Sequence, residues 1–116
     1  MNYTVKESHF ILGTRWRYKV TLEKFIIIVT FYYDKETQEC CVSFATFADD
    51  LELEALDNNF LRFKEVKEIM QAVLACFNMF RSEHNFKFFC EPTTLSRAKL
   101  YRRAGFIQKG ERMYLN

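Results

Sequence analysis

The hydrophobic and polar positions of this chain alternate in its first half and follow a helical period in its second half. Every second residue from Trp16 to Leu22 is apolar, and the residues between are basic or threonine, which is typical of a half-buried strand. Residues 25–33 are mostly β-branched or aromatic and predict a strand buried on both faces. Further strands are predicted at residues 3–12, ended by Gly13-Thr14, and at 40–47, after a polar turn at 34–38. The first half is expected to form an antiparallel meander.

The second half predicts two helices and two further strands. Apolar residues recur at helical spacing from Phe63 to Phe80, so a long helix is predicted from Leu61 to Glu83. An apolar run at 85–90 predicts a strand, and residues 94–104 predict a short amphipathic helix. Gly105 is expected to end that helix because glycine tolerates a positive φ. A last strand is predicted from 106, with Gly110 as a turn or bulge before residues 113–115.

This order of elements predicts an α+β fold. A meander, a long helix and then strand–helix–strand indicate a mixed, mostly antiparallel sheet with one long helix and one short C-terminal helix. The stretch 49–59 fits a strand or a helical turn, and we favour a strand that breaks at 57–59. A length of 116 residues indicates a single domain, residues 1–116. We expect a cytoplasmic protein without membrane association, because no apolar run reaches membrane-spanning length and the N-terminus is polar.

Cysteine spacing and charge narrow the chemistry further. The cysteines at 40, 41, 76 and 90 show no Cys-x-x-Cys or Cys/His spacing, so we expect buried free thiols and no metal. The net charge of +2 is unevenly distributed: residues 91–116 carry six Lys or Arg against two Glu, whereas 49–57 is acidic without a basic residue. This distribution would suit an anionic ligand beside a cationic one, and the alternative is two solvated faces.

The segment Leu100-Tyr-Arg-Arg-Ala-Gly-Phe106 resembles the closing motif of the GNAT (GCN5-related N-acetyltransferase) family, Asn-x-x-Ala-x-x-Leu-Tyr-x-x-x-Gly-Phe. Its Leu, Tyr, Gly and Phe match, while Thr94 stands at the Asn position and Arg97 at the Ala position. The predicted order of elements is also similar to that family. Its members usually have two helices between their first two strands, where residues 13–15 here leave room only for a turn. The resemblance implies a minimal GNAT-like fold.

The resemblance also implies an acyl-CoA site, which this sequence alters. The family's loop before the long helix, Gln/Arg-x-x-Gly-x-Gly/Ala, binds the cofactor's pyrophosphate through backbone N–H groups. Glu65 and Lys67 stand where its glycines belong, and side chains there block the approach of a phosphate. Lys64 and Lys67 would offer some charge in return. The implied cofactor-binding positions are Arg62, Lys64, Lys67, Thr94, Arg97 and Arg102.

The catalytic residues implied by the family are a tyrosine and a carboxylate. Tyr101 matches the tyrosine that donates a proton to the leaving CoA thiolate. The alternative for Tyr101 is packing on the sheet edge. Glu52, Glu54 and, further along, Asp57 lie near the position of the family's general base. His9 and His84 are isolated in the sequence, and we expect no catalytic role for either.

Two functions remain open. One is a GNAT-like protein with a degenerate acyl-CoA loop, weak or no catalysis and a protein-interaction role, similar to small GNAT-like proteins of tailed bacteriophages. Its partner would be a virion component or a host protein, and its location the host cytoplasm or the virion. The alternative is an active N-acetyltransferase that uses acetyl-CoA to modify an amine. Arg102 and Arg103 could reach CoA phosphates or nucleic acid, but no RNA-binding signature is present, so nucleic acid is not the expected partner.

Overall fold

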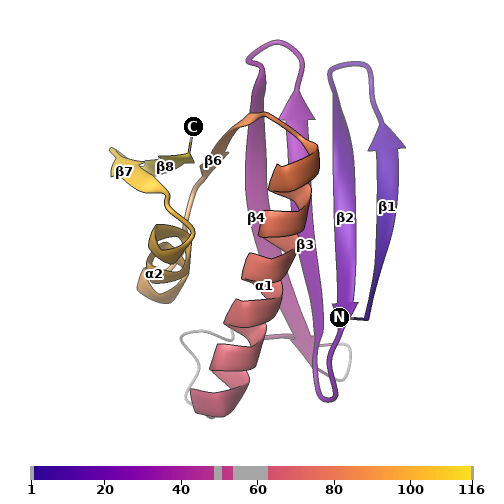
Figure 1. The fold of residues 1–116 in the computed structure, drawn as a ribbon, viewed down its shortest axis with the longest axis vertical. Helices are drawn as coiled ribbons and strands as arrows, with labels where there is room; N and C mark the ends of the chain where they lie inside the picture. Colours follow the sequence, from indigo (N-terminus) through magenta and orange to yellow (C-terminus); the bar gives the residue numbers. More distant parts are fainter. Residues whose placement is uncertain (1, 49–50, 54–62, 116) are drawn as a thin grey trace.

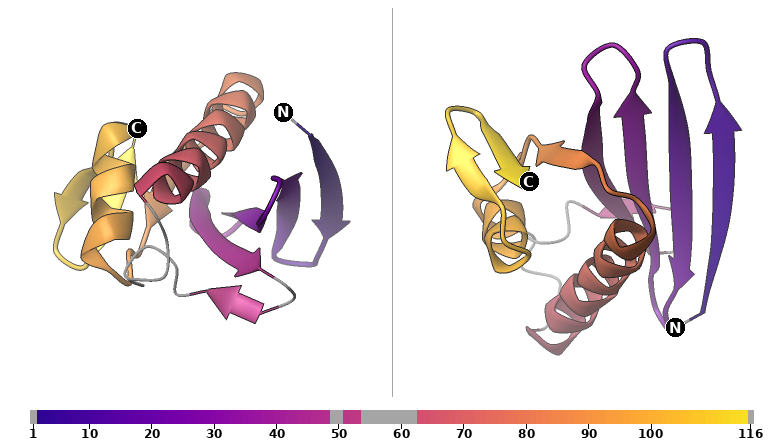
Figure 2. Two further views of the ribbon diagram at one scale, coloured as in Figure 1. Left: turned by 90° about the horizontal axis from the view of Figure 1, so that it is seen from below. Right: turned by 45° about the horizontal axis from the view of Figure 1, so that its top comes forward.

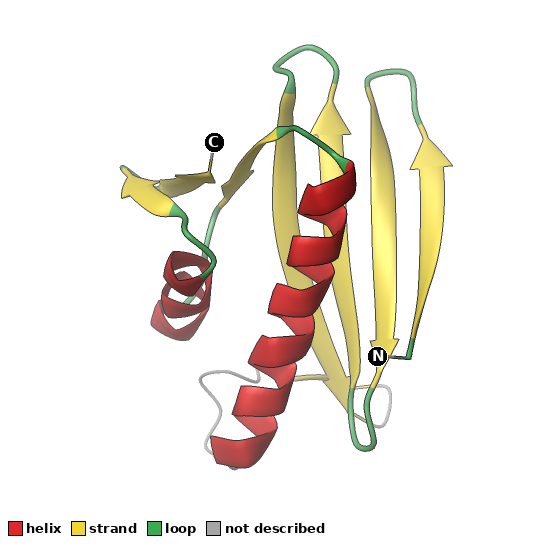
Figure 3. Ribbon diagram, viewed as in Figure 1, coloured by secondary structure: helices red, strands yellow, loops and turns green. Residues whose placement is uncertain are grey.

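The computed structural model of this chain describes residues 2–48, 51–53 and 63–115 (Figure 1). In chain order the elements are β1 (Tyr3–His9), β2 (Gly13–Thr21), β3 (Ile26–Asp34), β4 (Glu39–Ala48), β5 (Leu51–Leu53), α1 (Phe63–Glu83), β6 (Lys87–Cys90), α2 (Leu95–Arg103), β7 (Ile107–Lys109) and β8 (Arg112–Leu115). Figure 3 shows this succession of strands, a long helix, and a smaller strand–helix–strand unit. The predicted stretch 49–59 forms a strand at β5, and the remainder of it lies outside the described residues.

The described strands form one sheet in the order β1-β2-β3-β4-β6-β8-β7, with β5 pairing with β4. Every neighbouring pair is antiparallel except β4 and β6, which run parallel. The parallel pair requires a crossover, and α1 supplies it. The predicted α+β fold, with a mixed and mostly antiparallel sheet, one long helix and one short C-terminal helix, is confirmed.

Helix α1 covers one face of the meander, and the core lies between them (Figure 2, left). The strand register places Tyr18, Val29 and Phe44 in one row on this face, and all three are buried. From α1, Phe77 and Phe80 pack onto Phe31 in the next row of this face, and the rings of Phe31 and Phe80 stack with centroids 4.0 Å apart. Alternation along the strands therefore produces the core, as the period of two requires.

The expectation that residues 25–33 are buried on both faces is wrong. In β3 the odd-numbered residues from Ile27 to Phe31 are buried beneath α1, whereas Ile26, Ile28 and Tyr32 on the opposite face are only half-buried. The run is continuously apolar, so its sequence shows no alternation, yet no described helix covers its second face (Figure 2, left). This face therefore retains apolar surface beside solvent.

The first hairpin turns earlier than predicted. Strand β1 ends at His9, and the expected turn at Gly13-Thr14 is wrong, since β2 begins at Gly13. Reciprocal backbone hydrogen bonds between Phe10 and Gly13 close a loop whose two central residues are Ile11 and Leu12. A Cβ at position 13 would overlap the carbonyl oxygen of Tyr33 on the neighbouring strand. The glycine is required by this close approach within the sheet, and not by the turn.

The C-terminal third follows the prediction closely. Thr94 caps the N-terminus of α2, with its Oγ1 accepting a hydrogen bond from the Arg97 N–H at 3.2 Å. Gly105 follows the helix with φ +102°, and Gly110, with φ +68°, lies in the turn that joins β7 to β8. The predicted last strand is thus a hairpin, which joins the sheet through β6 and β8.

Candidate functional site

The candidate site lies at a gap along one edge of β4. The other edge of β4 pairs with β3 over its whole length from Glu39 to Phe47. On the gap side, β6 pairs with β4 only at residues 39–41, and β5 only at residues 46–48. Among the described strands, none pairs with residues 42–45 on this edge. The backbone groups there need other partners, because buried carbonyl groups are rarely left without a hydrogen bond.

Helix α2 supplies these partners through two side chains. The Tyr101 hydroxyl donates to the Val42 carbonyl at 3.4 Å, and Arg97 Nη1 donates to the Phe44 carbonyl at 3.1 Å. The Arg97 guanidinium also lies over the Phe44 ring, 4.7 Å from its centroid. Residues four apart on a helix rise about 6 Å, and residues two apart on a strand rise about 6.7 Å. The helix therefore matches the strand and substitutes for a paired strand.

Tyr101 is enclosed by this arrangement. It is 5% exposed, and its ring packs edge-on against Phe44 and Phe106. Burial raises the pKa of its hydroxyl far above the ordinary value, the Cys90 thiol raises it further, and Arg97 opposes the shift. The hydroxyl therefore stays protonated, and its hydrogen bond is directed into the protein.

The other α2 positions implied as cofactor contacts also have partners within the chain. Thr94 Oγ1 is engaged in the helix cap, and Arg97 is engaged at the β4 edge. Arg102 Nη2 donates to Gln108 Oε1 at 3.1 Å on the surface. The structure brings Tyr101 and Arg97 together at the β4 edge, while Arg102 lies on the exposed side of α2.

The positions aligned with the family's phosphate loop are helical. Lys64, Glu65 and Lys67 all lie within α1, and Lys67 is exposed. Lys64 and Glu65 lie in the first turn of α1, where backbone N–H groups have no carbonyl partner within the helix, whereas the N–H group of Lys67 lies beyond that turn and is not free for a phosphate. Glu52 lies in β5 opposite Phe47, while Arg62, Glu54 and Asp57 lie outside the described residues.

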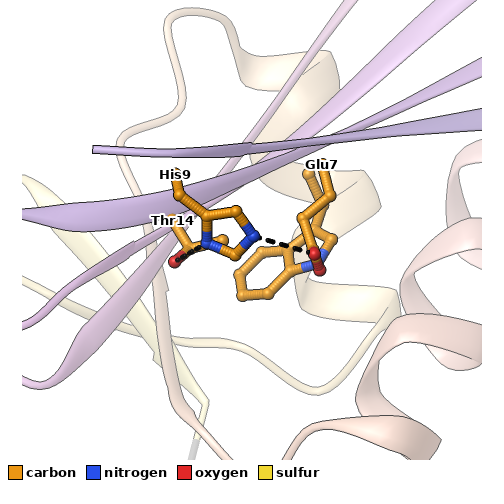
Figure 4. Close-up of polar contacts among 4 residues, drawn as sticks. Glu7, His9 and Thr14 are labelled. Carbon is orange, nitrogen blue, oxygen red and sulfur yellow. Dashed lines mark hydrogen bonds and ion pairs between the residues drawn. The ribbon is translucent and has the colours of Figure 1, made fainter.

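A second polar cluster, which the sequence reasoning missed, lies at the edge of the sheet (Figure 4). His9 Nε2 is 3.0 Å from Glu7 Oε2, and His9 Nδ1 is 3.4 Å from Thr14 Oγ1. The indole N–H of Trp16 donates to the other oxygen of Glu7. These bonds, with the Trp16 bond as the largest cause, lower the pKa of Glu7. Glu7 and His9 are two residues apart on a strand, and this spacing could have indicated that they share a face. Only the register of the hairpin shows which residues of β2 they lie opposite.

The order carboxylate, imidazole, hydroxyl in this cluster is that of a hydrolase triad, but its surroundings are not. The side chains of His9 and Glu7 are 70% and 50% exposed, so water reaches the whole cluster. A catalytic carboxylate–imidazole pair is normally buried and faces an oxyanion site. We assign this cluster to holding Trp16 and the first hairpin in place.

The described ranges contain no group of three or more His, Cys, Asp or Glu side chains arranged to hold a metal ion. The four cysteines are free, and three of them are buried. None of the helices in the described part of the chain has the length and apolar character needed to cross a membrane.

Comparisons of the chain with protein-family models, curated proteins and solved structures found no match. The resemblance to the GNAT family therefore remains an expectation drawn from the residues of the C-terminal half.

Proposed function

We propose that this chain is a GNAT-like protein that does not use acyl-CoA and acts by binding another protein. The observation that carries this proposal is the position of Tyr101. Its hydroxyl is buried and donates to the Val42 carbonyl, whereas an acid catalyst must reach the atom that receives its proton.

The long helix supports the same proposal, because its start does not provide the glycine positions that bind the cofactor's pyrophosphate. In the family the glycine positions let a pyrophosphate approach free backbone N–H groups. Here Glu65 and Lys67 stand at these positions inside α1, so a side chain replaces each glycine, and the N–H group of Lys67 lies beyond the first turn and bonds within the helix. The carboxylate at position 65 would also repel a phosphate.

Exposed apolar residues support a role in binding a protein. Ile11 is 94% exposed, and Leu95 and Ile107 are also largely exposed. Single exposed apolar residues are common, but Ile11 lies beside the exposed Phe10 and Leu12, and such grouped apolar residues mark interaction sites. By the resemblance to phage proteins, the partner is a virion component or a host protein.

Titration calorimetry with acetyl-CoA tests the proposal. We expect no heat of binding with ligand concentrations up to about 1 mM, the concentration at which a binding free energy is only about 4 kcal/mol. A micromolar dissociation constant would overturn the proposal in favour of the alternative, an active N-acetyltransferase.

The variant Tyr101→Phe separates the two functions. In an enzyme it would lower turnover of an amine substrate without weakening acetyl-CoA binding, because the hydroxyl acts only on the leaving thiolate. In the proposed role it lowers stability by about 1 kcal/mol, as expected for one lost hydrogen bond, and there is no turnover to lose. Urea unfolding and an acetylation assay on the same preparation measure both effects.

A further inference from the structure

The face of the meander opposite α1 is a candidate interaction surface, and its assignment rests on the proposed protein-binding function. We call it the open face. It consists of the even-numbered residues of β1 and β3 and the odd-numbered residues of β2 and β4, which share rows by their register. One such row runs Lys6, Arg17, Thr30, Ser43. Sheet faces with apolar residues are normally covered by another layer, and no described helix covers this one.

Three hollows follow one another along the open face. The first, of about 630 Å³, lies at the β1–β2 hairpin and is lined by Phe10, Arg15 and Tyr32 among others. The second, of about 350 Å³, has Ile28, Ala45 and Phe47 beneath it and Arg17 at its side. The third, of about 280 Å³, shares Phe47 with the second and continues to Ile26. Together they form a track with an apolar floor and a basic side.

The basic side forms no ion pair within the described chain, and Glu23, the one carboxylate among the residues that line the three hollows, belongs to the third hollow at the end of the track. Lys6, Arg17 and Lys19 are exposed, and none of them forms an ion pair with a described carboxylate. Lys6 even lies directly opposite Arg17, an arrangement of like charges that destabilises a sheet. By contrast, Lys87 and Arg112 in the C-terminal third are paired with Glu39 and Glu91.

The hairpin tip at the end of the track is also unusual. Two-residue hairpin loops favour Asn-Gly and similar pairs with positive φ, yet the central residues here are Ile11 and Leu12, neither with positive φ. Both are exposed, and Phe10 beside them lies under the Arg15 guanidinium, 5.2 Å from ring centroid to cation. Apolar residues replace turn-forming residues where the track opens to solvent.

We propose that the open face binds an amphipathic helix of a partner protein, with its apolar stripe on Ile28 and Phe47 and acidic residues against Arg17 and Lys19. The chemistry of the partner follows from the track: an apolar stripe is complementary to its aliphatic floor, and carboxylates on one flank are complementary to its one-sided row of cations. From Tyr32 to Ile26 the floor is about 20 Å long, the length of a helix of about 14 residues.

The floor distinguishes this partner from nucleic acid. Single-stranded nucleic acid binds to stacked aromatic rings within a positive groove. Here the aromatic residues Tyr32 and Phe47 line different hollows, with Ile28, Thr30 and Ala45 in the middle of the floor, and Arg17 lies on one side of it. Isoleucine and alanine side chains offer no stacking platform and match the aliphatic stripe of a helix.

A designed peptide pair tests the proposal with the full chain. The probe is a stapled helical 14-residue peptide, a length of about four turns, with leucines at i, i+3, i+4 and i+7 and glutamates along one flank. The matched probe carries lysines in place of the glutamates. We expect the acidic peptide to bind at least tenfold more tightly by fluorescence anisotropy, with an affinity that falls as salt is raised.

Charge reversal locates the site. Arg17→Glu/Lys19→Glu should weaken the acidic peptide at least tenfold, and because both residues are exposed the variant should keep its melting temperature within a few degrees. The control is Arg81→Glu/Lys99→Glu, the same change in net charge placed on exposed positions of α1 and α2, and it should bind like the unmodified chain.

Equal binding of the two peptides, or equal loss in both double variants, would overturn the proposal. Tighter binding of a single-stranded oligonucleotide, of anionic vesicles or of a second copy of this chain would also overturn it. If neither peptide nor acetyl-CoA binds, the open face is not the binding surface, but the proposed function still stands. If acetyl-CoA binds with a micromolar dissociation constant, the proposed function itself is refuted.

Discussion

Phe80 contacts aromatic rings from three strands and from the end of its own helix. Its ring stacks on Phe31 of β3 at 4.0 Å, meets Trp16 of β2 edge-on at 5.1 Å, and lies 6.0 Å from Phe88 of β6. Pairs of this kind add to the free energy gained by burying each ring. A single side chain thus contacts the meander and β6 from its position on the long helix.

Replacing Phe80 with alanine should lower the free energy of unfolding by about 3–5 kcal/mol, because it leaves a cavity among rings that cannot all move inward. Urea unfolding followed by far-UV circular dichroism measures the change. Asn78→Ala, at an exposed position on the same helix, is the control and should stay within about 0.5 kcal/mol. Similar losses in both variants would show that Phe80 does not connect these elements.

At the residue scale, the sequence predicted which side chains are buried better than it predicted what they contact. The helical spacing of the apolar residues from Ile69 to Phe80 marked the face of α1 that packs on the sheet. The partner of Tyr101 was not predictable, because Val42 lies 59 residues earlier and its free carbonyl results from a gap between two strand pairings. The residues Glu54, Asp57 and Arg62 lie outside the described residues, so their predicted roles stay predictions.

The loop of the first hairpin is less stable than its type of turn allows. Its loop residues, Ile11 and Leu12, are not the ones that favour a two-residue turn between twisted strands. Changing them to Asn-Gly should therefore raise the free energy of unfolding by about 0.5–1 kcal/mol. Thermal unfolding measures this gain, and a loss of stability would show that the apolar pair supports the fold. If the tip belongs to the binding track, the same variant also weakens the acidic peptide.

Gly13→Ala is the opposite change in the same hairpin. A methyl group at this position would overlap the Tyr33 carbonyl oxygen and the Tyr32 ring, so we expect a loss of about 2 kcal/mol or more. Gly110→Ala is the control: it introduces the strain of a positive φ, which Gly13 does not have, but nothing lies within 4 Å of the added carbon. It should therefore cost less, about 1 kcal/mol.

At the scale of elements, the existence and type of each described strand and helix were predictable, and the boundaries of the hairpin were not. Alternation and glycine placement marked β2 and the turn at Gly110 correctly. They misplaced the first turn, because Gly13 was interpreted as a turn residue when it is needed for close packing between strands. A glycine in a sequence can indicate either a positive φ in a turn or the close approach of another backbone, and only the position of the neighbouring strand distinguishes the two.

For the whole molecule, the buried thiols make stability depend on alkaline pH. Burial raises the pKa of Cys76 to about 11 and that of Cys90 to about 12, from an ordinary value of 9.0. Above pH 9 the unfolded chain releases these protons and the folded chain does not, so the free energy of the unfolded state falls relative to that of the folded state. Stability is therefore unaffected by these groups below pH 9 and falls between pH 9 and about 11 to 12.

Urea unfolding at pH 7.5, 9 and 10.5 under reducing conditions measures this dependence. One thiol shifted by two pKa units should account for about 1–2 kcal/mol of the loss between pH 9 and 10.5. Cys76→Ala removes that group, and its stability should fall less steeply over the same interval. An identical slope in the variant would show that the thiol of Cys76 ionises as easily in the folded chain as in the unfolded one.

The fold class followed from the order of elements alone, because strands followed by a long helix and a strand–helix–strand unit leave few ways to bury every apolar face. The open face did not follow. The continuous apolar run of β3 predicts burial on both sides, and nothing in the sequence states that the second side has no covering layer. That surface becomes visible only when the strands are assembled.

The gap at β4 has a further consequence for how the chain is made. The groups that close this edge of β4 come from β6 and α2, which are synthesised only after the whole of α1. Hairpins with local contacts form early, and parallel pairing across a long connection forms late. The nascent meander therefore leaves the ribosome with one strand edge unpaired, and this edge can pair with other chains until the C-terminal third has been synthesised. Ribosome-bound chains that stop at Glu83 should recruit chaperones that full-length chains do not need.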